Sequence, residues 1–163
     1  MKIKLQVIIL SMVAFFHGHS QNQLVSVGFG LGRSFQENSG FSYGGQLSLS
    51  SSLDSSKALT VGIGYSKSIK YKEISAFSFG LGLDFYSQEV FKGLHIGPSA
   101  TLGLQSPGNF KLFTVGVGLG HVINAGSNVV IDPSIGLGYT FVMGYSQYNA
   151  LAMSGVVAIG FVF

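Results

Sequence analysis

Large apolar residues alternate with glycine or serine at every second position over most of this sequence. Between residues 24 and 33, Val25, Val27, Phe29 and Leu31 hold one parity, while serine and glycine hold the other. Because successive side chains of a strand point to opposite faces, this segment is expected to form a strand with one strongly apolar face and one nearly bare face. Eight segments carry the pattern: 24–33, 41–50, 59–66, 77–85, 94–103, 113–120, 131–141 and 151–163.

Short segments rich in turn-forming residues separate these strands. Gaps this short join antiparallel neighbours, since a parallel crossover needs about a dozen residues or more. The sequence therefore predicts an antiparallel meander with an even number of strands. Pro98 interrupts the fifth segment, where its missing N–H argues for a local bulge. The turns are expected at 36–40, 54–57, 70–73, 87–89, 106–109, 124–128 and 144–149.

The direction in which the large residues point decides between two architectures. A soluble sandwich or barrel would have to bury them, but the interior of an eight-stranded barrel is only just wide enough for side chains. Turned outward, the same residues meet lipid, and closure of the barrel satisfies the backbone groups that lipid cannot. We therefore predict an all-β fold, an eight-stranded antiparallel up-and-down transmembrane β-barrel, in preference to the soluble sandwich.

The composition fits a surface that is only partly covered by water. Charged residues make up only 9% of the chain and apolar residues 47%, which is too little charge to keep an ordinary soluble domain dispersed. The sequence has no cysteine. Disulfides, CxxC sites and thiol chemistry are therefore excluded.

Residues 1–20 have the layout of a signal peptide. Lys2 and Lys4 precede an almost wholly apolar run, 5–16, and small residues follow it. The alternative, a membrane-spanning helix, needs about 20 apolar residues, and this run is shorter. The barrel domain is then 21–163, with a net charge of +1, because two of the nine basic residues are removed and the six acidic ones remain. Such a charge gives no reason to expect nucleic acid as a partner.

The last strand carries the most specific pattern. Phe163 is the final residue, and apolar residues precede it at every second position back to Val157. This ending resembles the C-terminal signal by which outer-membrane proteins are recognised for insertion. Two further features are a cleavage region ending in Ser20-Gln21 and a strand that opens with Gly97-Pro98-Ser99. With these features, the chain resembles the small porin-like outer-membrane β-barrel proteins of Bacteroidetes-type bacteria.

This resemblance implies a location and partners but no single activity, because such families do not share one. It implies the bacterial outer membrane, contact with its lipid and lipopolysaccharide, and recognition by the barrel-insertion machinery through the strand that ends at Phe163. Both termini would lie in the periplasm. The outer loops would then be 33–40, 70–74, 105–110 and 143–150, all short compared with the long partner-binding loops of larger members.

An outer-membrane enzyme is the sharpest alternative. Lipid A deacylases are barrels of similar size with a histidine and a serine two residues apart on one outward strand face. Here His95 and His121 are followed at that spacing by Gly97 and Ile123, so the motif is absent and we expect no catalysis. The glycines of 28–32 are not followed by a helical pattern, so neither a nucleotide nor another cofactor is expected.

Three polar residues near the predicted periplasmic end point inward by parity: Asp84, His95 and Asp132. If the hairpin between the first two is symmetric, they face each other directly across neighbouring strands. The first interpretation is a polar cluster that closes the lumen and pairs poorly solvated charges. The second is a pH-sensitive gate, since a neighbouring carboxylate alters the titration of a histidine. A metal site is less favoured, because two carboxylates and one histidine without close spacing form a weak ligand set.

Four cations, Arg33, Lys67, Lys70 and Lys72, gather at the predicted outer rim. Lys67 has outward parity, so its ammonium can extend along the wall toward lipopolysaccharide phosphates. Ordinary solvated loop charge is the simpler interpretation, because the rim of any barrel is polar.

Two functional classes follow for the barrel. The first is a structural or interaction role without catalysis, favoured because eight-stranded barrels generally have filled interiors. The second is a narrow passive pore or a small-ligand carrier. It is favoured by the small inward residues, among which the last strand contributes Ala152, Val156, Ala158 and Val162.

Overall fold

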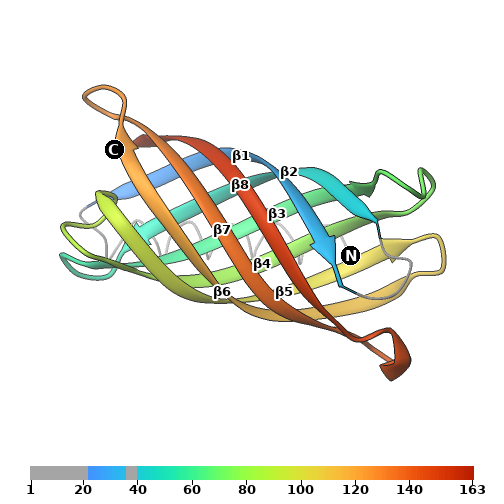
Figure 1. Cartoon of the computed structure of the whole chain (residues 1–163). Coiled ribbons are helices and arrows are strands. Elements are labelled where there is room, and N and C mark those ends of the chain that lie inside the picture. Colours follow the sequence, from blue (N-terminus) through green and yellow to red (C-terminus); the bar gives the residue numbers. More distant parts are fainter. Residues whose placement is uncertain (1–21, 36–39) are drawn as a thin grey trace, which may run out of the picture.

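The protein forms a closed barrel of eight antiparallel strands in sequence order, in which β1 also pairs with β8 (Figure 1). The structure, a computed structural model, describes residues 22–35 and 40–163. The predicted signal peptide, 1–20, and part of the first predicted outer loop lie outside the described residues. The strands are β1 (Gln23–Ser34), β2 (Phe41–Ser52), β3 (Lys57–Ser68), β4 (Ser75–Tyr86), β5 (Gly93–Ser106), β6 (Phe110–Asn124), β7 (Val129–Val142) and β8 (Ala150–Val162).

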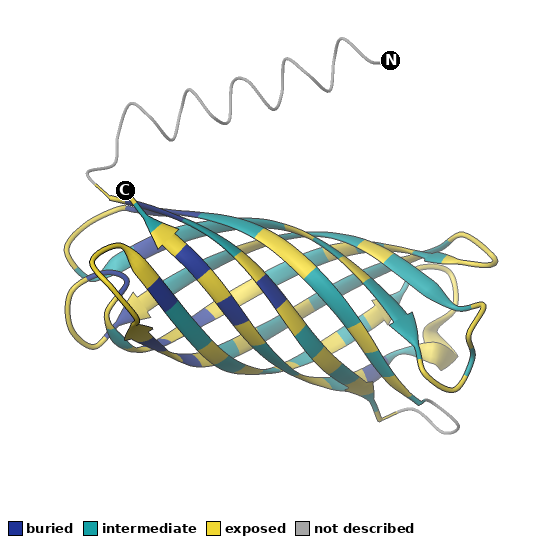
Figure 2. Ribbon diagram, turned by 90° about the horizontal axis from the view of Figure 1, so that it is seen from above, coloured by how far each residue is buried: buried dark blue, intermediate teal, exposed yellow. Residues whose placement is uncertain are grey.

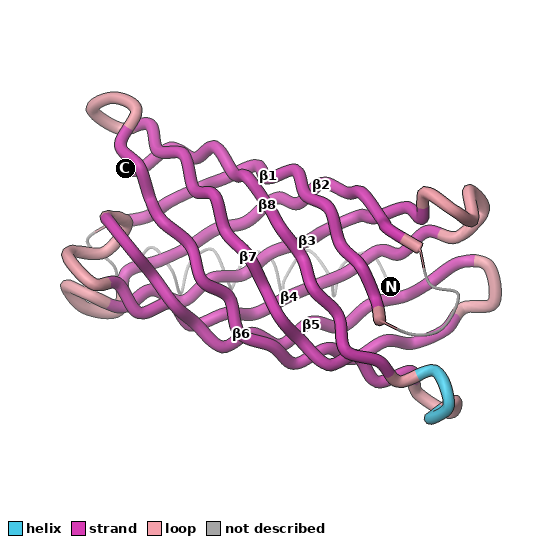
Figure 3. Tube along the Cα trace, viewed as in Figure 1, coloured by secondary structure: helices cyan, strands magenta, loops and turns pink. Residues whose placement is uncertain are grey.

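Short connections gather at the two ends of the barrel (Figure 3). The β1–β2, β3–β4, β5–β6 and β7–β8 connections lie at one end, here called the loop end, and a single 3-10 turn, η1 (Ser146–Tyr148), falls in the last of them. The start of β1 and the end of β8 lie at the other end, the terminal end. No helix in the described part of the chain is long and apolar enough to cross a membrane.

The outward face of the barrel is apolar and exposed, as the alternation predicts. Phe29, Ile135 and Ile159 are 71%, 63% and 60% exposed, respectively. Figure 2 shows exposed and less exposed residues alternating along the strands. Because the large residues point outward, the fold agrees with the predicted transmembrane barrel and not with a soluble sandwich, which would bury them.

The two prolines inside strands interrupt the ladder without a bulge. Pairing of β4 with β5 breaks between Gly82↔Ser99 and Phe85↔Ile96, and the register is the same on both sides of the gap. The bulge expected at Pro98 is therefore absent. A similar gap separates β6 from β7 beside Pro133. In both places the ladder loses two pairs, as expected where a residue has no N–H to donate.

Candidate functional site

The terminal end of the barrel is closed by apolar side chains, here called the apolar floor. Most of them are inward-facing residues at strand ends, and all are at most 9% exposed. The floor consists of Leu24, Ala58, Tyr86, Val90, Phe91, Val122 and Val130, with Val162 packed against it. Phe91 is 2% exposed, and its ring meets the ring of Tyr86 edge-on at 5.8 Å between centroids.

Two residues of the floor belong to the turn between β4 and β5. This turn spans 87–92, longer than the predicted 87–89, and its Val90 N–H donates to the Ser55 carbonyl at 2.8 Å. Phe91 has φ +61°, a left-handed conformation that costs a residue with a Cβ about 1–2 kcal/mol. The turn therefore folds back under the barrel. The predicted turn does not include these two residues, although two adjacent apolar residues in a polar turn are a usable signal in the sequence.

The register of β4 against β5 corrects the predicted pairing of Asp84 with His95. The residue directly across from His95 is Tyr86, and Phe85 pairs with Ile96. A hairpin symmetric about residues 87–92 would place Asp84 across from His95, and the observed register is shifted from this arrangement by two residues. A shift of two preserves the inward face of each side chain, so Asp84 and His95 remain close, but diagonally.

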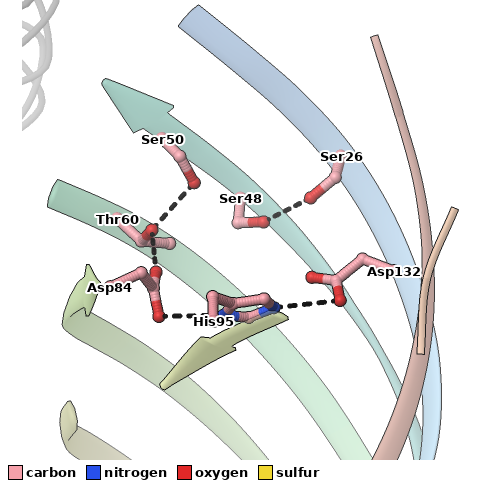
Figure 4. Close-up of polar contacts among 7 residues, drawn as sticks. All are labelled: Ser26, Ser48, Ser50, Thr60, Asp84, His95 and Asp132. Carbon is pink, nitrogen blue, oxygen red and sulfur yellow. Dashed lines mark hydrogen bonds and ion pairs between the residues drawn. The ribbon is translucent and has the colours of Figure 1, made fainter. Parts of the chain in front are cut away.

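Asp84, His95 and Asp132 meet in the lumen directly beside the apolar floor and form the centre of a polar chain (Figure 4). Nε2 of His95 lies 3.0 Å from Oδ1 of Asp132. Because an ionised carboxylate only accepts hydrogen bonds, Nε2 is the donor. On the other side, Nδ1 of His95 lies 3.5 Å from Oδ1 of Asp84, and this buried nitrogen makes no hydrogen bond. The Tyr86 ring stacks on the imidazole at 5.2 Å.

The polar chain continues across two further strands. Thr60 Oγ1 donates to Oδ2 of Asp84 at 2.9 Å. Since that hydroxyl hydrogen is used, the Ser50 hydroxyl, 2.8 Å away, donates to Thr60. Figure 4 shows the chain running from Ser50 on β2 to Asp132 on β7. The hydroxyls therefore hold one carboxylate in place while His95 holds the other.

A glycine makes the contact between His95 and Asp132 possible. His95 lies on β5 and Asp132 on β7, so the contact passes over β6, where Gly120 stands opposite His95. A Cβ at Gly120 would overlap Nε2 of His95 and lie 2.8 Å from Oδ1 of Asp132. The missing side chain at this position therefore opens the path for the hydrogen bond.

Above the polar cluster the lumen holds a cavity of about 930 Å³. Its lining runs from Ser34, Tyr71 and Tyr148 near the loop end to Asp84 and His95, and is largely glycine, serine and threonine. A separate hollow of about 580 Å³ lies below the floor, and no residue lines both. The floor therefore lies between the two spaces: Leu24 and Tyr86 line the upper one, and Val90 and Phe91 line the lower one.

The described residues include no group of three or more histidine, cysteine or acidic side chains arranged to hold a metal ion. In the polar cluster, His95 Nε2 is engaged by Asp132, and the two carboxylates lie on opposite sides of the imidazole. The arrangement is that of a charge-paired hydrogen-bond network.

The four predicted rim cations lie at the loop end, on or next to β1, β3 and the β3–β4 connection. The Arg33 guanidinium lies 5.1 Å from the Phe41 ring centre, and Lys70 Nζ lies 5.1 Å from that of Tyr71. Lys67 pairs across the sheet with Tyr43. Lys72 is exposed. Cations and aromatic rings therefore share this part of the rim, a combination typical of membrane interfaces.

Comparison with protein-family models and with curated proteins gives no match. Among solved structures, Neisserial surface protein A is similar, with a TM-score of 0.61, 16% identity, and coverage of 86% of this chain and 95% of that one. The outer membrane protein OprG of Pseudomonas aeruginosa matches with a TM-score of 0.56, 11% identity and coverage of 89% and 97%. A de novo designed transmembrane β-barrel matches with a TM-score of 0.52, 13% identity and coverage of 88% and 97%.

These likenesses show the fold. The chain has the closed eight-stranded architecture of outer-membrane transmembrane β-barrels, as the alternation of its sequence predicts. The identities are too low to transfer an activity, a partner or a source organism, because one fold supports many functions.

Proposed function

We propose that this protein is a bacterial outer-membrane barrel with a structural or interaction role that neither conducts ions nor catalyses a reaction. The observation that carries the proposal is the apolar floor, which seals the terminal end with side chains that are at most 9% exposed. The outward apolar band supplies the lipid contact. The polar cluster beside the floor is a network of paired charges, and its role is to stabilise the closed end.

Conductance in a planar bilayer tests the closed floor. The refolded protein is expected to give no steady current. As a control, the Tyr86→Ala/Phe91→Ala double variant removes the two rings of the floor, and current in this variant alone identifies the floor as the barrier. Steady current through the unchanged protein contradicts the proposal and supports the narrow-pore alternative.

Orientation is the second part of the proposal, with the loop end outside the cell and the terminal end in the periplasm. The native chain has no cysteine, so a maleimide labels only a cysteine that is introduced at a chosen position. Ser146→Cys, at the loop end, should react with a membrane-impermeant maleimide on intact cells. Ser127→Cys, in the turn at the other end, should react only after the cells are lysed. The reverse pattern would overturn the orientation.

Lipopolysaccharide is the partner proposed for the rim formed by Arg33, Lys67, Lys70 and Lys72. Its phosphates would meet the cations, while the neighbouring rings lie at the lipid interface. Replacing all four with Gln should reduce retention of the protein on immobilised lipopolysaccharide. Lys57→Gln/Lys92→Gln, at the other end of the barrel, is the control and should leave retention unchanged. Equal retention of the two variants would refute the proposal that these four cations bind lipopolysaccharide.

Recognition by the barrel-insertion machinery is proposed for the strand ending at Phe163. The backbones of Phe163 and Gln23 exchange two hydrogen bonds, of 2.9 and 3.0 Å. Deleting Phe163 would remove both bonds, so the test substitutes the side chain instead. Phe163→Ala keeps these bonds and should reduce insertion in cells while leaving refolding into detergent intact. Equal loss in both assays would indicate a stability defect instead.

A further inference from the structure

The cavity above the polar cluster has the size and shape of a ligand site. Its volume of about 930 Å³ lies within the roughly 300–1,000 Å³ typical of small-molecule pockets. The lining reaches the loop end at Ser34, Tyr71 and Tyr148 and stops at the floor. A molecule that enters from the loop end therefore comes to rest against Asp84, His95 and Asp132.

The charge at the bottom of this cavity is negative. With both carboxylates ionised, the cluster carries −1 when His95 is protonated and −2 when it is neutral. Arg33, the remaining charged residue among the described lining, lies at the opposite end, where its guanidinium faces the rings of Phe35 and Phe41. Charges of one sign in a narrow, low-dielectric space attract the opposite charge strongly.

The cluster also retains binding capacity toward the lumen. The side chains of Asp84 and Asp132 are 22% and 23% exposed, and the hydrogen bonds to them engage Oδ2 of Asp84 and Oδ1 of Asp132. The His95 side chain is only 9% exposed, and its Nδ1 faces Oδ1 of Asp84 at 3.5 Å without forming a hydrogen bond. Buried polar atoms are nearly always paired, so the cluster is incomplete as a polar site.

We propose that the lumen binds a slender organic cation, a primary amine on an unbranched polar chain, with its ammonium held by Asp132, one of the two carboxylates that flank the His95 imidazole. An ammonium has three donors, which suits a carboxylate whose side chain is 23% exposed. The rest of the molecule lies along the hydroxyl-lined wall toward the loop end. Amines with bulky or branched substituents are excluded from the lumen, because an eight-stranded barrel is narrow even when its inward residues are small. The proposal rests on the closed floor of the proposed function.

A matched pair of probes tests the charge requirement. The refolded protein in detergent micelles is titrated with 1,4-diaminobutane and, separately, with 1,4-butanediol, which has the same length and no charge. Backbone amide signals of Thr60, Asp84 and His95 are followed by NMR. The diamine should shift them saturably and the diol should not. Equal shifts from both probes, or a diamine response that never saturates, overturn the proposal.

Variants locate the site. Asp132→Asn should weaken diamine binding at least tenfold, whereas Asp54→Asn, which removes an exposed carboxylate at the terminal end, should not change it. Thr101→Trp keeps both carboxylates but fills the lumen above them, and should also abolish binding. Far-UV circular dichroism confirms that each variant is folded. If Asp132→Asn and Thr101→Trp, both folded, bind as the unchanged protein does, the amine binds elsewhere and the inference is wrong.

The binding measurement and the conductance measurement can refute their two proposals independently of each other. A barrel that conducts ions and also binds the amine would refute the closed floor but leave the proposed binding site standing. A barrel that conducts no ions and whose amide signals do not shift on addition of the amine would refute the binding site but leave the proposed function standing.

Discussion

Gly120→Ala is the most direct test of how the polar cluster is built. Gly120 stands on β6 between the strands of His95 and Asp132, and an added Cβ would overlap His95 Nε2. The imidazole would have to move away from Asp132. Its ring also stacks on Tyr86, so it has little room to do so without losing a second contact. The expected effect is loss of the hydrogen bond between His95 and Asp132.

The size of the effect follows from two opposing contributions. A hydrogen bond to a charged group is worth about 1.5–3 kcal/mol, while replacing a strand glycine with alanine gains about 0.5–1 kcal/mol in backbone entropy. Gly118→Ala is the matched control, on the same strand and inward face, where the nearest atom to a Cβ is 3.8 Å away. The backbone gain is common to both variants. Gly120→Ala should therefore be less stable than Gly118→Ala by about 1.5–3 kcal/mol.

Urea unfolding in phospholipid vesicles, followed by far-UV circular dichroism, measures this difference. Each variant is also made in a His95→Ser background, where the gap between the two alanine variants should shrink because the imidazole is gone. Equal stability of Gly120→Ala and Gly118→Ala in the native background would refute the proposed path over β6. So would a gap that persists unchanged without His95.

Two further perturbations probe the floor and the turn beside it. Phe91→Ala should lower the free energy of unfolding by about 3–5 kcal/mol, since the ring is nearly fully buried; a loss below about 1 kcal/mol would show that the floor does not pack as described. A hydrogen bond from Lys57 lowers the pKa of Asp54 from 3.8 to about 2, so Lys57→Gln should raise that pKa toward 3.8 in an NMR titration of the carboxyl carbon. Because the folded pKa is depressed, the stability from Asp54 is present above pH 3.8 and is lost as the pH falls toward 2. An unchanged pKa in Lys57→Gln would refute the pairing.

The strand pattern was predictable because it depends on a local period. Phe29 and Ile159 point outward, and most of the strand glycines have inward parity. Short polar turns leave antiparallel neighbours as the simplest arrangement. The same parity placed Asp84, His95 and Asp132 on the inner face. These features need only the spacing of residues along one strand.

The depth and partners of the cluster were not predictable in the same way. They depend on the register between β4 and β5, which pairs Tyr86 rather than Asp84 with His95, a shift of two residues that the symmetry of the turn does not predict. They also depend on closure, which brings Asp132 of β7 within reach of β5 over Gly120. Thr60 was missed because one inward threonine among many carries no distinguishing signal in the sequence.

The hydrogen bonds between Gln23 and Phe163 have a consequence for how the chain could be rearranged. They extend a continuous antiparallel ladder that makes β1 and β8 ordinary neighbours. The ring of strands therefore has no preferred seam. A circular permutant, joined between these two residues and opened at a loop-end connection, should close the same barrel, because chain ends that lie side by side tolerate such changes. Such a permutant would separate the geometry of closure from the need for a particular strand to come last.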